Sequence, residues 1–217
     1  MPRLVVAWVL LLCAALAWAA APLPEALQSQ LDRAVLDYES GRHQEARRVF
    51  ESLARRHVPV AEFNLALMHL QGDVPKPDRV HARRLLERAA GGGFVTAQLL
   101  LAQQLENAGF GGRRDIVAAN RWYEKAALAG SVEGQVAMGT AYYLGRGATK
   151  DPALAAQWYR EAAKGGDIGA MYLLASMYEQ GDGVERDLRL ARYWYEAAAR
   201  GGDEAAPGKV KELDSRL

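Results

Sequence analysis

One pattern recurs along this chain at a nearly constant period. Trp-Tyr pairs begin at Trp122, Trp158 and Trp194, so consecutive pairs lie 36 residues apart. An alanine pair starts four residues after each tryptophan, a glycine follows at eight, and an aspartate precedes it by seven. A repeat of this length is one supersecondary unit that buries its apolar face only against a neighbouring copy. The chain is therefore predicted to be an array of stacked units.

An earlier copy extends the array toward the N-terminus. Leu85 takes the tryptophan place 37 residues before Trp122, with Asp78 and Gly93 at the expected offsets. The pattern thus occurs four times, and the predicted repeats cover residues 61–96, 97–132, 133–168 and 169–203.

Each repeat divides into two helical halves. In the first half, apolar or small residues recur at offsets 0, 4, 5 and 8 from Ala61, Ala97, Gly134 and Ala170. This spacing forms one stripe of an α-helix, here named helix A. The Trp-Tyr half forms a second helix, named helix B, and glycine-rich segments such as 181–187 separate the two. An all-α fold of antiparallel helix pairs follows.

The recurring residues have structural roles in this interpretation. The aspartates stand where helix B begins, where a carboxylate accepts from free backbone N–H groups. The glycines stand where helix B ends and suit a left-handed cap. The indole rings are predicted to fill the joints between hairpins, so Trp158→Ala should cost at least about 3 kcal/mol. These structural residues are Trp122, Trp158, Trp194, Gly93, Gly130, Gly166, Gly202, Asp78, Asp115, Asp151 and Asp187.

Three sequence motifs resemble those of a known family. They are A-x-x-x-L-[AG]-x-x-Y in helix A, G-x-G-[VA]-x-[KR]-D in the loop, and A-x-x-W-Y-x-x-A-A-x-x-G in helix B, most clearly in residues 170–202. They are similar to the SEL-one-like repeat family, which is related to tetratricopeptide repeats. The resemblance implies a right-handed α-solenoid superhelix of about five stacked antiparallel hairpins, and an adaptor role. The atypical loop at 106–114 departs from the family pattern.

Some secreted bacterial relatives hold each repeat with a disulfide and have been linked to β-lactam binding or hydrolysis. The single cysteine here, Cys13, lies outside the repeats, so that activity is not carried over.

Flanking segments are predicted to close the array. Residues 22–60 form a tetratricopeptide-like capping hairpin with a turn at Ser40-Gly41. Residues 204–217 supply a short C-terminal cap, which Pro207 and Gly208 should interrupt and fray.

Residues 1–21 have the features of a signal peptide. Arg3 precedes an apolar core at 4–16, and Ala17-Trp18-Ala19 is an A-x-A site, so cleavage is predicted after Ala19. The alternative is an inner-membrane anchor formed by residues 4–21, which are just long enough to span a bilayer. The first interpretation predicts a periplasmic or secreted protein without cysteine.

Charge and motif content argue against several functions. The chain has 27 Lys and Arg against 26 Asp and Glu, and Arg3 lies in the export segment, so 26 of each remain. A neutral chain is a poor candidate for nucleic-acid binding. His43, His57, His69 and His81 show no metal-ligand spacing, and no nucleophile motif is present. No catalytic, metal or cofactor site is therefore predicted.

The remaining candidate is the surface of helix A, which in such folds lines the concave side. Positions that vary between repeats are predicted to form a partner-binding face: Glu62, Asn64, Met68, Gln98, Gln104, Gln135, Tyr143, Met171 and Met177. The leading hypothesis is an exported scaffold that binds a protein or peptide in the bacterial envelope, with peptidoglycan or polysaccharide machinery as candidate partners. The alternatives are an envelope hydrolase directed at β-lactams or peptidoglycan, and a glycan-binding module.

Overall fold

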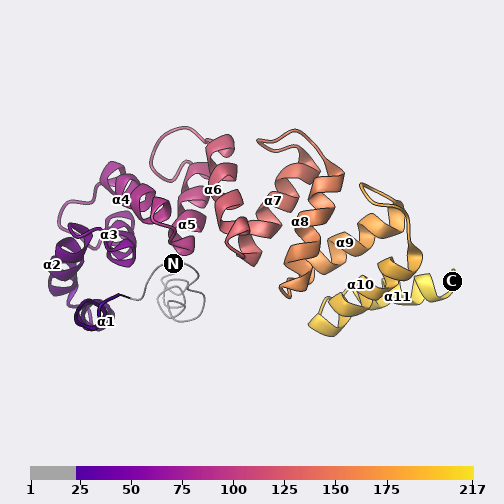
Figure 1. The fold of residues 1–217 in the computed structure, drawn as a ribbon, viewed down its shortest axis with the longest axis horizontal. Coiled ribbons are helices and arrows are strands. Elements are labelled where there is room, and N and C mark those ends of the chain that lie inside the picture. Colours follow the sequence, from indigo (N-terminus) through magenta and orange to yellow (C-terminus); the bar gives the residue numbers. More distant parts are fainter. Residues whose placement is uncertain (1–22) are drawn as a thin grey trace. The chain divides into compact units, whose positions relative to one another are not determined.

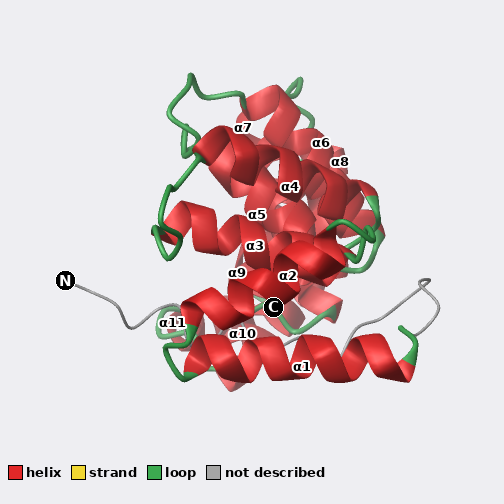
Figure 2. Ribbon diagram, turned by 90° about the vertical axis from the view of Figure 1, so that its left-hand side faces the viewer, coloured by secondary structure: helices red, strands yellow, loops and turns green. Residues whose placement is uncertain are grey.

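The computed structural model describes residues 23–217, and within them every regular element is an α-helix (Figure 2). The predicted signal peptide lies outside the described residues. The prediction of an all-α fold of helix pairs is confirmed. The described helices are α1 Glu25–Glu39, α2 His43–Ala54, α3 Pro59–Gln71, α4 Arg79–Gly91, α5 Val95–Glu106, α6 Ile116–Leu128, α7 Val132–Leu144, α8 Pro152–Lys164, α9 Ile168–Gln180, α10 Leu188–Gly201 and α11 Ala206–Asp214.

None of these described helices is long and apolar enough to cross a membrane. The chain divides into an N-terminal unit, Met1–Gln98, and a C-terminal unit, Leu99–Leu217, and the boundary falls within α5. Each unit is described by itself.

Local chemistry sets the ends of helix B in each repeat. The side chains of Asp78, Asp115, Asp151 and Asp187 are the N-caps of α4, α6, α8 and α10, and each accepts from backbone N–H groups of the first turn. At the other end, Gly93, Gly130, Gly166 and Gly202 all have φ between 86° and 102°, a left-handed conformation that costs glycine little. These caps stop each helix after three to four turns and return the chain for the next one.

The N-terminal unit consists of the hairpins α1–α2 and α3–α4 and the start of α5. Its most deeply buried large side chains are aliphatic or phenyl groups, among them Phe50, Leu53, Phe63, Leu85 and Leu86, all at most 2% exposed. Leu85 and Leu86 occupy the places of the Trp-Tyr pair in the later repeats. This core is therefore formed without the aromatic pair.

The C-terminal unit has two layers of helices (Figure 1). Gln103 of α5 donates to Glu133 of α7, α7 and α9 share one apolar cluster, and Lys209 and Arg216, in and after α11, bind Glu179 of α9. The A helices α5, α7, α9 and α11 therefore lie side by side, and α6, α8 and α10 form the other layer. This arrangement gives the unit an exposed helix-A face.

The rings that fill the joints of this unit are tyrosines, which corrects the prediction about the indoles. Tyr159 and Tyr195 are 2% and 1% exposed, whereas Trp122, Trp158 and Trp194 are all only partly buried. Trp194 does contact both apolar clusters of the unit, from the edge of each. The second residue of the Trp-Tyr pair thus points inward.

The C-terminal cap also differs from its prediction. Pro207 does not interrupt a helix, because α11 starts only at Ala206 and places the proline in its first turn, where no backbone N–H is needed. Asp203 accepts from the backbone N–H groups of Ala205 and Ala206. Ala206 and Leu213 are completely buried, so the cap packs firmly on α10.

Candidate partner-binding surface

One exposed stripe runs along each A helix of the C-terminal unit. It occupies the side of the helix opposite the residues that pack on helix B, at spacings of four, three and four residues. In α7 and α9 the inner stripe consists of Glu133, Ala137, Thr140 and Leu144, and of Gly169, Leu173, Ser176 and Gln180, all exposed or half-buried.

The chemistry of the inner stripe is mostly uncharged. Leu144 and Leu173 are 56% and 38% exposed, next to hydroxyl and amide side chains. The one acidic side chain, Glu133, already accepts from Gln103 at 2.7 Å. Exposed leucines among short polar groups suit a protein segment with apolar anchors and backbone groups to bind.

The partner-binding residues predicted from sequence do not coincide with this stripe. Five of the nine are buried in the structure, with 1–6% of their surface exposed, and cannot contact a partner in this conformation: Glu62, Asn64, Met68, Gln98 and Met177. The prediction was wrong for these five residues.

Most of the error has a geometric cause. The packing residues lie at offsets 0, 4, 5 and 8, and successive residues turn by about 100° around a helix. Offset 1, which holds Glu62 and Gln98, falls within that packing face, whereas offsets 3 and 6 lie opposite it. Met68 and Met177 lie at offset 7, only about 20° from offset 0. Asn64 is an exception, because it is buried at offset 3, the offset that is exposed at Leu173. Variation between repeats was therefore mistaken for exposure.

Residues at offset 1 hold neighbouring helices together. The amides of Gln98 and Gln135 donate to the carbonyl oxygens of Ala90 and Ala127, which end the preceding helix B, at 3.1 and 3.4 Å. At the same place in the first repeat, the buried carboxylate of Glu62 accepts from Arg88 at 2.7 Å. Its other neighbour is the Nδ1 atom of His57, at 3.7 Å.

The other four predicted residues, Gln104, Gln135, Tyr143 and Met171, are half-buried. Tyr143 is engaged by Lys150, whose ammonium lies 6.0 Å from the ring centre. Burial and a hydrogen bond to Asp182 raise the pKa of its hydroxyl. Gln104 and Tyr143 border the inner stripe, whereas Gln135 and Met171 lie within the packing face.

Sequence reasoning missed a recurring polar contact between helix B and helix A of the same repeat. Tyr123 and Tyr195 of helix B donate to Glu106 and Glu179 of the preceding helix A, at 3.1 and 3.0 Å. Burial and the adjacent carboxylate raise the pKa of both tyrosines. The signal was present in the sequence, since both glutamates occupy the same repeat position.

The middle joint replaces that glutamate contact with a hydroxyl pair. Tyr143 stands where the second and fourth repeats have glutamate, and the Tyr159 hydroxyl instead lies 3.1 Å from the hydroxyl of Thr140. The Tyr159 ring crosses Gly139 so closely that an added Cβ would lie 2.7 Å from two ring carbons. Glycine at this position lets the ring reach the inner stripe.

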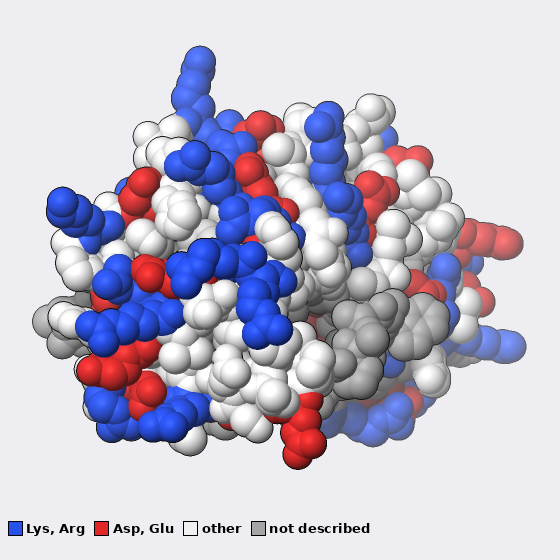
Figure 3. All heavy atoms as spheres, turned by 60° about the vertical axis from the view of Figure 1, so that its left-hand side comes forward, with Lys and Arg blue, Asp and Glu red and all other residues white. Residues whose placement is uncertain are grey.

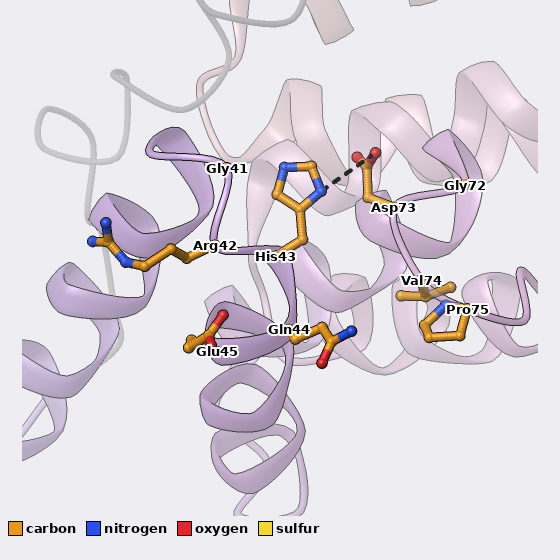
Figure 4. Close-up of a pocket in the computed structure, with 9 residues that line it drawn as sticks. All are labelled: Gly41, Arg42, His43, Gln44, Glu45, Gly72, Asp73, Val74 and Pro75. Carbon is orange, nitrogen blue, oxygen red and sulfur yellow. Dashed lines mark ion pairs between the residues drawn. The ribbon is translucent and has the colours of Figure 1, made fainter.

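A polar groove of about 480 Å³ lies in the N-terminal unit, between the α1–α2 turn and the α3–α4 loop (Figure 4). His43 and Asp73 point toward each other across it, with 3.8 Å between Nδ1 and the carboxylate. Tyr38 stacks on His43 and donates to Asp73 at 2.6 Å. Arg42 points away and pairs with Asp37. These groups satisfy one another, so the groove shows no ligand-directed chemistry.

The described residues contain no group of three or more His, Cys, Asp or Glu side chains placed to hold a metal ion. All four histidines have neighbours of another kind: His43 and His57 lie beside carboxylates, and His69 and His81 contact each other at 4.9 Å.

Comparison with known proteins gives one family. The model of the Sel1 repeat matches residues 59–94, 95–131, 132–167 and 168–203. No curated protein matches the sequence significantly.

Two solved structures are similar over most of the chain. A protective antigen of uropathogenic Escherichia coli, which displays an SLR fold, is 28% identical with a TM-score of 0.77 over 86% of this chain and 41% of its own. A Sel1 repeat protein from Oxalobacter formigenes is 27% identical with a TM-score of 0.76 over 84% of this chain and 74% of its own. The chain thus spans less than half the length of the first.

Proposed function

The chain belongs to the Sel1 repeat family, and from that premise we propose that it is a non-catalytic scaffold that binds another protein in the bacterial envelope. Proteins of this family generally mediate interactions between proteins. The partner is proposed to be a protein segment or peptide. Candidates include components of the machinery that handles peptidoglycan or polysaccharide.

The inner stripe carries the binding proposal. Its exposed Leu144 and Leu173 come from adjacent repeats of one layer, with Thr140 and Ser176 beside them as hydrogen-bonding groups. Leucine side chains exposed to water are unfavourable in free energy. A partner that covered them would gain about 25 cal/mol for each Å² of apolar surface removed from water. Gln104 and Tyr143 would form the border of the site.

The envelope location rests on the N-terminal segment alone. Residues 1–21 have the charge, the apolar core and the Ala17-Trp18-Ala19 site of an export signal. The mass of the protein recovered from cells tests this directly. A chain that starts at Ala20 supports export with cleavage, and an intact N-terminus in the membrane fraction supports an anchor at 4–21.

Site-specific photocrosslinking tests the binding surface. A photoreactive amino acid is placed at Leu144 or Leu173 on the inner stripe, and at the exposed Gln157 on the outer face of α8 as the matched control. We expect a discrete protein adduct from the two inner positions and none from position 157. Equal adducts from all three positions would mean that contact is nonspecific.

Two readouts separate the rival functions. A glycan-binding module would give adducts that disappear after digestion of the glycan rather than of a protein. A separate assay tests for a hydrolase, which would turn over a reporter β-lactam or peptidoglycan fragments. Turnover by the purified protein that a substitution in this chain abolishes would contradict the scaffold proposal.

A further inference from the structure

A second surface, on the N-terminal unit, has the opposite chemistry to the inner stripe. The outer sides of α2 and α4, with the turn after α2, carry a row of exposed arginines, here named the basic face: Arg48, Arg55, Arg56, Arg79, Arg83 and Arg84. Lys and Arg side chains gather on this side of the unit in Figure 3. The near-neutral total charge of the chain conceals this local excess.

Contacts through α3 make the two rows one surface. His69 of α3 touches His81 of α4 with 4.9 Å between ring centres, and it lies within electrostatic range of Arg47 on α2. At the other end, the buried Glu62 links Arg88 of α4 to His57, directly after Arg56. Both α2 and α4 therefore pack against α3, which fixes their outer sides relative to each other.

Most of the positive charge on the basic face is not neutralised within the unit. Arg83 pairs with Glu87, and Arg84 lies within electrostatic range of the Asp78 carboxylate. Among the described residues, Arg48, Arg55, Arg56, Arg79 and Arg84 have no carboxylate within 4.0 Å. The first helix, α1, instead holds the acidic residues Glu25, Asp32, Asp37 and Glu39 against the single Arg33. The segments that form the basic face, α2 with its following turn and α4, hold eight arginines against three glutamates, Glu45, Glu51 and Glu87. The excess of positive charge is therefore local to these segments.

We infer that the basic face is a second docking surface, and that its partner is an acidic segment of another protein. Its cations on α2 and α4 are arginines, whose planar fork binds a carboxylate with two parallel hydrogen bonds. A lipid surface fits less well, because membrane-bound faces place Trp, Phe or Leu beside their cations, and Val80 is the one large apolar side chain exposed on α4. This surface is independent of the inner stripe, so either proposal can fail alone.

The test measures binding of a synthetic glutamate-rich helical peptide to the purified protein by fluorescence anisotropy at low salt. The same peptide with glutamine for glutamate is the ligand control. The variant Arg48→Glu with Arg84→Glu reverses charge on both helices of the basic face. Arg121→Glu with Arg189→Glu makes the same change of net charge on the C-terminal unit and is the protein control.

We expect the basic-face variant to bind the acidic peptide at least tenfold more weakly, and the control variant to bind within twofold of the parent. Binding should also weaken strongly between 50 and 500 mM salt, because exposed charges are screened. Arg48→Lys with Arg84→Lys keeps the charge but loses the paired hydrogen bonds, and should weaken binding about threefold. Thermal melts establish that all variants fold.

Three results would overturn the inference. The first is that the parent does not prefer the glutamate peptide over the glutamine peptide, or that both reversed variants lose binding equally. The second is tighter binding to phosphatidylglycerol vesicles than to the peptide, which would assign the face to a membrane. The third is a parent that self-associates in light scattering through the basic face, which would make the acidic α1 of a second copy the partner.

Discussion

The two units stack the same kind of hairpin but fill the joints differently. In the C-terminal unit, buried Tyr123 and Tyr195 of helix B donate to Glu106 and Glu179 of helix A, and the Tyr159 hydroxyl shares a hydrogen bond with that of Thr140. Each pair of helices is therefore both packed and hydrogen-bonded. In the N-terminal unit Leu86 takes the tyrosine place, and the polar link is the ion pair between Glu62 and Arg88. One scaffold thus tolerates two ways of fixing adjacent helices.

The two units also differ in their surfaces. The inner stripe of the C-terminal unit is mostly uncharged and has two exposed leucines. The outer helices of the N-terminal unit carry a row of exposed arginines. The C-terminal unit is therefore suited to an apolar protein segment, and the N-terminal unit to an acidic one.

The largest effect is expected at the tyrosine joints. Tyr159→Ala should reduce the free energy of unfolding by about 3–5 kcal/mol, because it removes a ring that is 2% exposed and leaves a cavity. Trp158→Ala should cost only about 1–2 kcal/mol, since the indole is half-buried. Urea denaturation of the two variants measures both. A larger loss for Trp158→Ala would restore the indole as the main joint residue.

A smaller effect is expected where the ring crosses helix A. Gly139→Ala places a methyl group 2.7 Å from the Tyr159 ring and should cost about 1–3 kcal/mol. The cost should fall to less than half in a Tyr159→Leu background, because the clash is then removed. A double-mutant cycle gives this coupling directly. Independent costs would show that glycine is needed for another reason.

The ion-pair joint of the N-terminal unit should respond to loss of charge alone. Glu62→Gln keeps the size of the side chain but removes the carboxylate that Arg88 binds at 2.7 Å, and should cost about 1–2 kcal/mol. The matched exchange Gln98→Glu puts a carboxylate beside the Ala90 carbonyl and should also destabilise. If Glu62→Gln melts like the parent, the ion pair does not support the joint.

The smallest expected effect is a difference in the pH at which each unit loses stability. Burial and nearby His81 lower the pKa of His69 below 6.5. As pH falls below about 6.5, His69 therefore takes up a proton in the unfolded chain before it does in the folded one, and the stability that the neutral imidazole contributes declines. Burial opposes ionisation of Glu179, but hydrogen bonds from Tyr195, Lys209 and Arg216 outweigh it and lower its pKa. That contribution is present above 4.5 and is lost as pH falls through the lowered value.

Hydrogen exchange across a pH series can resolve the two units. The amides of α3 and α4 should lose protection at higher pH than those of α9 and α11. His69→Gln should remove the first transition and Glu179→Gln the second. Simultaneous loss in both units would contradict the assignment.

Much of the fold could be predicted because its signals are local and repeated. Aspartate before helix B and glycine after it define helix ends by backbone chemistry, and the structure has both at every repeat. Which ring of a Trp-Tyr pair points inward depends on the rotation of helix B against its neighbour. No local signal in the sequence specifies that rotation. The prediction that the larger ring, the indole, is the buried one was therefore wrong.

The binding surface was predicted less well for a related reason. Glu62 and Gln98 occupy the same repeat position and differ in chemistry, yet both are buried, because each makes a different polar contact there. A helical wheel centred on the packing offsets would have selected positions such as Leu173 instead. The basic face was hidden because charge was counted over the whole chain.

Cysteine accessibility tests the placement of the inner stripe most directly. Because Cys13 is the only cysteine, in the predicted export segment, Leu173→Cys and Met177→Cys can be compared as single labelling sites on one helix in the mature protein. The parent side chains are 38% and 3% exposed, so a maleimide should modify position 173 rapidly and position 177 only after unfolding. Equal rates, or faster reaction at 177, would mean that helix A presents its other side to solvent and that the proposed binding surface is wrong.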